Sequence, residues 1–263
     1  MKKILSILLT AYKNYIFYIR DIVGLNIILI LRLIVIITLY KYIYSNYSSK
    51  ELIFGYNITQ ITYAVIIAQI VSSSKPRIIG EISQDVKSGK VGVYLLNPIN
   101  YIWFKFLEIF PIFMQNVVFG LIFGLSIGFL MIGSFPITLA GFFGGFLLLI
   151  GSMLVVFFSY TFIAILAFYT EDVEAFRFIY AKLDMIFGGN ILPIPFLPTV
   201  LQNIAYASPF AYFGYTSGLI FVSFELHIFL KYLVIQLFWL IFTILSCIFL
   251  FDKASKKLTI NGG

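Results

Sequence analysis

IVGLNIILILRLIVIITLYKYIY, residues Ile22 to Tyr44, is an almost unbroken apolar run. A helix needs about 20 predominantly apolar residues to cross the hydrocarbon core of a bilayer. The run is long enough, and Tyr40, Tyr42 and Tyr44 at its far end are typical of side chains at the membrane–water interface. We therefore expect this stretch to be the first membrane-spanning helix.

The composition of the whole chain points to the same environment. Of the 263 residues, 61% are hydrophobic and only 11% are charged, whereas a soluble domain has roughly 25% charged residues. So few charges cannot cover the surface of a soluble globule of this size. The net charge of +7 is more typical of loops that face anionic lipid than of nucleic-acid binding in such a chain. We therefore expect membrane lipids, and no nucleic acid, among its partners.

Further apolar runs predict an all-α integral membrane protein that forms a single transmembrane domain over residues 1–263. The six predicted spanning helices are Ile22–Tyr44, Leu52–Val71, Pro111–Gly133, Ile137–Tyr169, Thr170–Phe187 and His227–Phe251. In the fifth, Thr170 has a side chain suited to an N-cap, and Glu171 and Asp172 follow it, where acidic groups complement the helix dipole.

Two charged segments lie outside these runs. Residues 1–21 combine apolar side chains with Lys2, Lys3, Lys13 and Arg20, which is typical of a helix lying in the membrane interface. Residues 72–104 form a polar connector between the second and third spans. Within it, residues 81–90 predict a short amphipathic helix that ends at Gly89. Such a helix suits docking of a cytoplasmic protein, although a merely solvated surface helix would have the same spacing.

The segment 188–224 is apolar but cannot form one spanning helix. Pro193, Pro195, Pro198 and Pro209 interrupt it, and proline breaks a helix interior. Broken backbone is tolerated at membrane depth only where protein buries it or where it lines a cavity. We therefore expect short re-entrant helices here, on the extracytoplasmic side.

The positions of lysine and arginine predict the orientation, because cytoplasmic loops carry an excess of both. They concentrate in the N-terminal segment, the connector, the first half of the fifth helix and the C-terminal tail. The turn between the third and fourth spans and the proline-rich segment contain neither residue. Both termini are therefore expected in the cytoplasm.

Two charges lie within the predicted spans. Arg32 is near the middle of the first, where a charge is costly and usually faces the bundle interior or a partner. Asp184 on the fifth helix is a candidate counter-charge, and contact of Arg32 with a substrate headgroup is the functional alternative. Gly120, Gly124 and Gly128 share one helix face and allow close approach of another helix, from the same chain or from another subunit.

No motif for catalysis or nucleotide binding is evident. Gly89-Lys90 is followed by Val91 and lacks the earlier glycine of a phosphate-binding loop. His227 is the only histidine and Cys247 the only cysteine. We therefore expect no catalytic residue, no metal site and no cofactor in this chain, which would not itself be an enzyme.

Two local patterns resemble ABC-2 type transporter permeases, in a branch of exporter permeases. The first is E-I-x-x-D-I-R-S-G-K-L-x-x-x-L-L-x-P. Here it stands as Glu81-Ile82-Ser83-Gln84-Asp85-Val86-Lys87-Ser88-Gly89-Lys90-Val91 and then Leu95-Leu96-Asn97-Pro98, with mild departures at positions 86, 87 and 91. The second is a glycine followed by P-[LI]-x-x-[FL]-P and P-F-x-Y. Here it stands as Gly189, Pro193-Ile194-Pro195-Phe196-Leu197-Pro198 and Pro209-Phe210-Ala211-Tyr212.

This resemblance implies the membrane subunit of an ATP-driven exporter in the plasma membrane of a prokaryote. A second permease, either a copy or a related chain, would complete the translocation path, and separate ATPase subunits would bind ATP and Mg²⁺. The implied coupling helix would contact the ATPase through Glu81, Ile82, Asp85, Val86, Lys87 and Gly89. The implied outer gate would comprise Gly189, Pro193, Pro195, Phe196, Pro198, Pro209, Phe210 and Tyr212.

Two other classes compete with this interpretation. An ion-driven transporter or channel would use Asp184 and the break at Gly188-Gly189, but inverted repeats are not evident. A membrane-embedded enzyme that modifies lipids would need a polar catalytic cluster, which the sequence does not show. The substrate stays open, since lipid-like molecules, drugs and peptides all suit an aromatic, apolar path.

Overall fold

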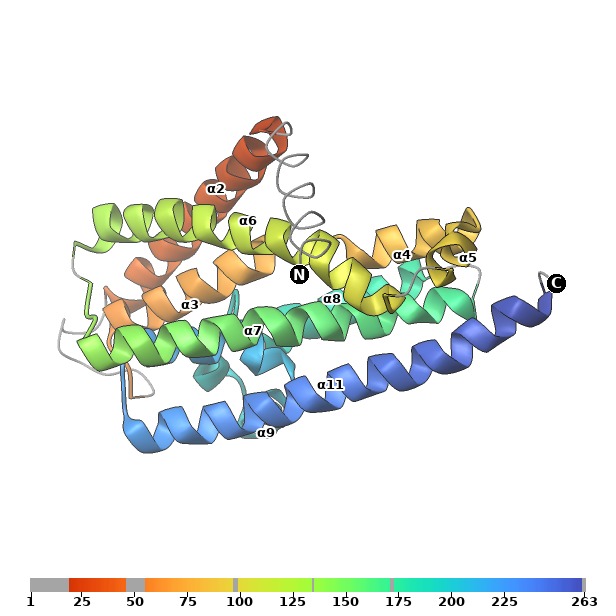
Figure 1. The fold of residues 1–263 in the computed structure, drawn as a ribbon. Coiled ribbons are helices and arrows are strands. Elements are labelled where there is room, and N and C mark those ends of the chain that lie inside the picture. The colour runs from red at the N-terminus through yellow and green to blue at the C-terminus, as the bar shows by residue number, and fades with distance from the viewer. Residues whose placement is uncertain (1–18, 46–54, 97–98, 134, 171–172, 262–263) are drawn as a thin grey trace.

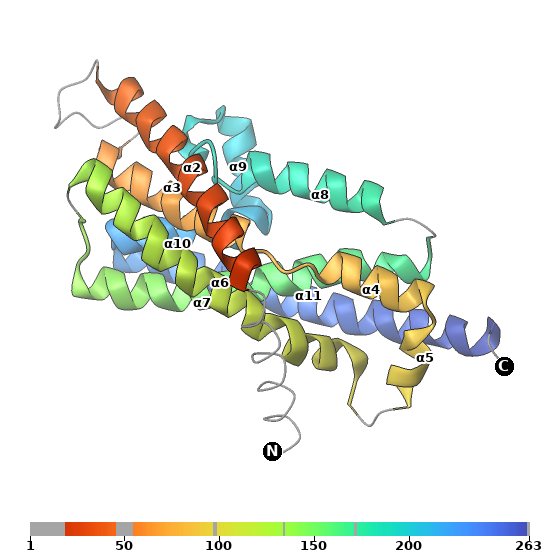
Figure 2. The ribbon, with the colours of Figure 1, turned by 90° about the horizontal axis from the view of Figure 1, so that it is seen from above.

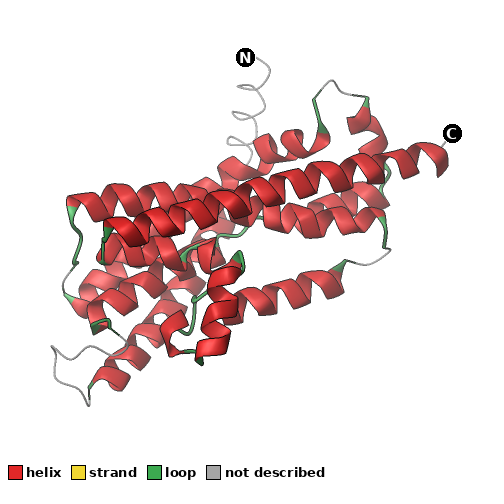
Figure 3. Cartoon of the chain, turned by 90° about the horizontal axis from the view of Figure 1, so that it is seen from below, coloured by secondary structure: helices red, strands yellow, loops and turns green. Residues whose placement is uncertain are grey.

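A computed structural model describes residues 19–45, 55–96, 99–133, 135–170 and 173–261. Over these ranges the chain forms helices and loops and no β-strand (Figures 1 and 3), so the all-α class is confirmed. Four of the described helices are long and apolar enough to cross a membrane. They are α2 (Ile19–Tyr44), α6 (Tyr101–Ile132), α7 (Leu139–Ile165, continued by the 3₁₀ turn η1, Leu166–Phe168) and α11 (Leu226–Asn261). The protein is thus a multi-pass membrane protein.

The predicted second and fifth spans are shorter than the other four. Helix α3 (Ile58–Ser73) has 16 residues and α8 (Glu174–Phe187) has 14, lengths of about 24 and 21 Å. Both are shorter than the ~30 Å hydrocarbon core. The count of six crossings therefore stays a prediction.

Several predicted helix boundaries are wrong. Helix α6 begins at Tyr101, where Asn100 Oδ1 accepts a hydrogen bond from the Ile102 amide, so the connector ends at residue 100 rather than 104. Pro111 lies inside this helix instead of starting it, which membrane helices tolerate because neighbouring helices, polar side chains and local backbone adjustments can satisfy the freed backbone group. Residues 19–21 belong to α2, and the rest of the predicted interface helix lies outside the described residues.

Thr170 does not cap the fifth helix as predicted. Its hydroxyl donates to the Leu166 carbonyl at 3.1 Å, so it closes the preceding 3₁₀ turn, and α8 begins only after Val173. Glu171 and Asp172 lie outside the described residues. At the other end, α11 continues past Phe251 to Asn261, and the start of the predicted basic tail is helical. This end of α11 projects beyond the other helices (Figure 1).

The glycines on α6 serve packing within the chain. A Cβ on Gly120 or Gly124 would lie 2.7 or 2.8 Å from the Ile70 side chain of α3, and one on Gly128 would lie 2.8 Å from the Tyr63 ring. Of the two interpretations of these glycines, approach of a helix from the same chain is the one the structure supports.

Helix α10 (Tyr215–Val222) fills the centre of the bundle, and all eight of its residues are buried between α3 and α7. A Cβ on Gly218 would lie 2.6 Å from the Ala64 carbonyl of α3. One on Gly145 of α7 would lie 2.5 Å from the Phe221 ring. The last part of the apolar, proline-broken segment is therefore covered by protein, as its backbone requires.

The rest of that segment leaves the bundle and comes back to it at the same level, and we refer to it as the excursion. It contains η2 (Ile194–Phe196), α9 (Thr199–Ala207) and η3 (Phe210–Phe213) (Figure 2). Gly189, at φ +62°, lies directly against Tyr215 at the start of α10. One continuous helix is excluded here, as predicted. Helices α8 and α10 together measure about 33 Å, enough to cross the hydrocarbon core.

Candidate coupling site and intramembrane polar cluster

The predicted amphipathic helix is present as α4 (Ile78–Lys87), followed by α5 (Lys90–Leu95). Gly89, between them, has φ +72°, a conformation that costs glycine nothing and that ends α4 where predicted. Ile78, Ile79 and Ile82 are buried on one face of α4, which packs against α7 and η1. These apolar contacts set which side of α4 remains open.

A buried charge cluster joins α4 to the base of α6. Lys105 is only 3% exposed, and its amine lies 2.9 Å from Asp85, 2.9 Å from Glu108 and 3.6 Å from Glu81. The Tyr101 hydroxyl donates to Asp85 at 2.8 Å. Since a buried charge is stable only when it is paired and hydrogen-bonded, this arrangement fixes α4 to α6 at a defined position.

The same surroundings affect protonation of Glu81. Burial raises the pKa of its carboxyl above the ordinary value, Lys105 opposes this, and Glu108 and Asp85 add to it. Glu81 is therefore easier to protonate than an exposed glutamate, because its ionised form is partly removed from water and lies near other carboxylates.

The opposite face of α4 is open. A groove of about 430 Å³ runs along it, lined by Gly80, Gln84, Lys87 and Ser88 together with Glu174 at the start of α8. Of the predicted coupling residues, Lys87 and Gly89 are exposed and Glu81 and Val86 are half-buried, whereas Ile82 and Asp85 face inward. The six residues thus divide into an open set and an anchoring set.

Sequence reasoning missed the α6 partners of this cluster. Lys105 and Glu108 are spaced i, i+3 in an otherwise apolar run, and they form an ion pair at 2.9 Å. That spacing places two side chains on one helix face, and it is the signal that could have identified them. Tyr101 carried no such signal.

The pairing predicted for the two intramembrane charges is wrong. Asp184 is 3% exposed and forms its ion pair with Lys75, in the link between α3 and α4. Arg32 instead donates to Gln69 Oε1 and Ser73 Oγ, each at 3.4 Å. Arg32 projects from α2 toward α3, whereas α8 approaches the bundle beside the α3–α4 link.

The Lys75–Asp184 pair belongs to a small polar cluster. Lys75 also donates to Ser72 at 3.2 Å and lies 5.5 Å from the centre of the Tyr160 ring. The Asn190 side-chain amide donates to the same Ser72 hydroxyl at 3.1 Å. The cluster therefore ties the α3–α4 link both to α8 and to the chain just after the Gly188-Gly189 break.

The predicted gate residues surround the excursion and are well packed. Gln202 donates to the Pro195 carbonyl at 3.1 Å, and the Tyr212 hydroxyl donates to the Tyr206 carbonyl at 3.1 Å. The Phe210 ring lies 5.0 Å from the Tyr180 ring of α8. Gly189, Pro193, Phe210 and Tyr212 are buried, Pro195, Phe196 and Pro209 are half-buried, and Pro198 is exposed.

The buried side-chain amide of Gln236 shows how far the excursion lies from the end of the bundle. Gln236 of α11 donates to the Leu148 carbonyl and the Ser152 hydroxyl of α7, each at 3.0 Å, and to the Tyr212 carbonyl at 3.4 Å. The rise from Leu226, where α11 begins, to Gln236 is about 15 Å. Tyr212 therefore lies near the middle of the bundle rather than at its end.

Comparison with known proteins identifies one family. The model of a family described as ABC-2 family transporter protein matches residues 25–262, which include all the described helices from the first turns of α2 onward. No curated protein matches the chain.

Proposed function

Because this chain belongs to the ABC-2 transporter family, we propose that it is the permease subunit of an ATP-driven exporter in the plasma membrane of a prokaryote. A second permease, a copy or a related chain, completes the translocation path. Separate ATPase subunits bind ATP and Mg²⁺ and drive the transport. The chain itself has no phosphate-binding loop motif, so nucleotide chemistry belongs to the partner.

The observation that carries this proposal is the two-sided environment of α4. Its open face, with Gln84, Lys87 and Ser88, is accessible to a soluble partner. Its inner face is held by ion pairs to Lys105 of α6 and by apolar packing to α7. A displacement of α4 by a docked ATPase is therefore passed directly to two long helices.

The arrangement of the other elements supports six crossings with both termini in the cytoplasm. Helices α8 and α10 act as the two halves of the fifth crossing, and the proline-rich excursion between them forms the gate. A discontinuous helix at the middle of the membrane is a recurrent feature of transporters, because its free backbone groups can line a path.

The coupling role predicts that reversing a charge on the open face weakens the complex. Lys87→Glu is expected to lower the amount of ATP-binding-cassette ATPase that co-purifies with the permease by at least about tenfold, since like charges brought together at an interface cost more than the ~1.4 kcal/mol that a tenfold loss of affinity requires. The matched control is Lys41→Glu, which changes an exposed lysine in the last turn of α2, away from α4. Unchanged co-purification of Lys87→Glu, with unchanged ATP turnover, would contradict the assignment.

The energy source separates this proposal from an ion-driven transporter. In vesicles that contain permease and ATPase, transport should require ATP and should persist when ion gradients are dissipated. Transport by the permease alone, driven by an imposed ion gradient, would favour the alternative.

A further inference from the structure

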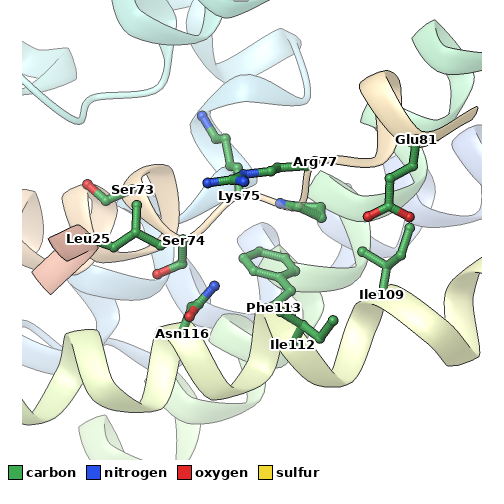
Figure 4. Close-up of a pocket in the computed structure, with 11 residues that line it drawn as sticks. Leu25, Ser73, Ser74, Lys75, Arg77, Glu81, Ile109, Ile112, Phe113 and Asn116 are labelled. Atoms are coloured by element: carbon green, nitrogen blue, oxygen red, sulfur yellow. The ribbon is translucent and has the colours of Figure 1, made fainter. Parts of the chain in front are cut away.

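A cavity of about 300 Å³ lies between α2, the α3–α4 link and α6 (Figure 4). One side of it is polar, with Ser73, Ser74 and Arg77. The side formed by α6 is mostly apolar, with Ile109, Ile112 and Phe113 beside Asn116, and Leu25 of α2 adds an apolar side chain near the two serines (Figure 4). The cavity lies apart from the open face of α4 and from the gate, although Glu81 of α4 contributes to its lining.

Of the two cations among the described lining residues, Arg77 is the one that faces the cavity. Lys75 also lines it, but Figure 4 shows its amine pointing away, and it pairs with Asp184. Glu81 is the only carboxylate among the described residues that line the cavity, and it lies 3.6 Å from Lys105. Arg77 is exposed, extends back over the cavity, and forms none of the ion pairs found among the described residues.

A second guanidinium approaches from α2. Arg32 donates to the hydroxyl of Ser73, which itself lines the cavity. Leu25 of the lining and Arg32 are two helical turns apart on α2 and therefore share one side of it. The cavity thus combines positive charge and hydroxyl groups with an apolar wall.

The depth of the cavity matches the headgroup level of a bilayer. Helix α3 measures about 24 Å from Ile58 to Ser73. If α3 begins at one boundary of a ~30 Å hydrocarbon core, Ser73 lies within about 6 Å of the other boundary. With the orientation proposed above, this is the inner leaflet, where anionic lipids concentrate.

We propose that this cavity binds the phosphate-bearing headgroup of an anionic lipid from the inner leaflet. Arg77 binds the phosphate directly, and Ser73 and Ser74 offer hydroxyl donors beside it. The upper part of an acyl chain packs against Leu25, Ile112 and Phe113. The proposal rests on the orientation of the chain and not on its coupling to an ATPase.

Native mass spectrometry of the full-length permease, purified in detergent, tests the site with phosphatidylglycerol and phosphatidylcholine as probes. The wild type should retain phosphatidylglycerol and much less phosphatidylcholine. Arg77→Gln should reduce retained phosphatidylglycerol by about fivefold, the expected effect of one cation near anionic lipid. Lys41→Gln, the matched control, should bind as the wild type does.

A second variant tests the apolar wall. Ile112→Trp fills the cavity without altering its charge and should also reduce retention of phosphatidylglycerol.

Equal retention by the wild type and Arg77→Gln, or equal binding of both lipids, would overturn the proposal. Full displacement of the lipid by inorganic phosphate would also overturn it, because the cavity would then be a site for a free anion. Failure of ATPase co-purification would leave this site unaffected, so the two proposals fail separately.

Discussion

Lys105 shows how one side chain can determine the position of a whole element. Three carboxylates lie within 3.6 Å of its amine, and two of them belong to α4. Without the ammonium group, the inward-facing Asp85 would keep only the hydrogen bond from Tyr101. The contact between α4 and α6 therefore depends on charge pairing more than on apolar area.

Lys105→Met is accordingly expected to destabilise the protein by about 3–5 kcal/mol, the usual effect of leaving a buried charge without its partner. Thermal unfolding in detergent measures this loss. The combination with Asp85→Asn should recover part of it, because the uncompensated carboxylate is then absent. Lys182→Met, at an exposed position of α8, serves as the control and should change stability by less than about 0.5 kcal/mol. Equal effects of the two lysine variants would refute the anchoring role.

At the scale of elements, the closest helix contacts depend on glycine. Helices α3 and α6 approach so closely that any Cβ at Gly124 would lie 2.8 Å from Ile70 Cδ1. The face formed by Gly120, Gly124 and Gly128 is therefore filled by α3 and is not free for a second subunit. Surface for a second permease must come from other helix faces.

Gly124→Leu is expected to cost about 1–3 kcal/mol by overpacking the contact between α3 and α6. Adding Ile70→Ala should restore much of the loss, since it returns the volume that leucine takes. Gly24→Ala is the control, because no atom lies within 4 Å of its Cβ position. Thermal unfolding of the four proteins measures the effect, and a neutral Gly124→Leu would show that the helices are less closely packed than described.

At the scale of the molecule, the long helices define two ends. Ser88 lies at the end that holds α4 and α5, and Glu225 lies at the other end, where α11 begins. Figure 1 shows these two ends separated by the length of the bundle. The proposed orientation places the first in the cytoplasm and the second outside.

Single cysteines test this orientation in a Cys247→Ala background. The native thiol is fully buried and donates to the Phe158 carbonyl, so it should not react. Glu225→Cys should react in intact cells with a membrane-impermeant maleimide, whereas Ser88→Cys should react only after permeabilisation. The opposite pattern would reverse the topology, and labelling of both from outside would exclude a spanning bundle.

The sequence by itself determined the membrane class, the α4 stop at Gly89 and the break after Phe187, because these depend on local properties. Apolar run length, glycine conformation and the missing amide of proline act within a few residues. Only the tertiary structure decided which charges pair. The Lys75–Asp184 pair joins the α3–α4 link to α8, and the Lys105–Asp85 pair joins α6 to α4, and tertiary packing rather than spacing along the chain brings these residues together. The same reason explains why spacing along the chain predicts the wrong partner for Arg32. It also explains why the burial of α10 at the centre of the bundle, after a proline-rich segment, could not be predicted.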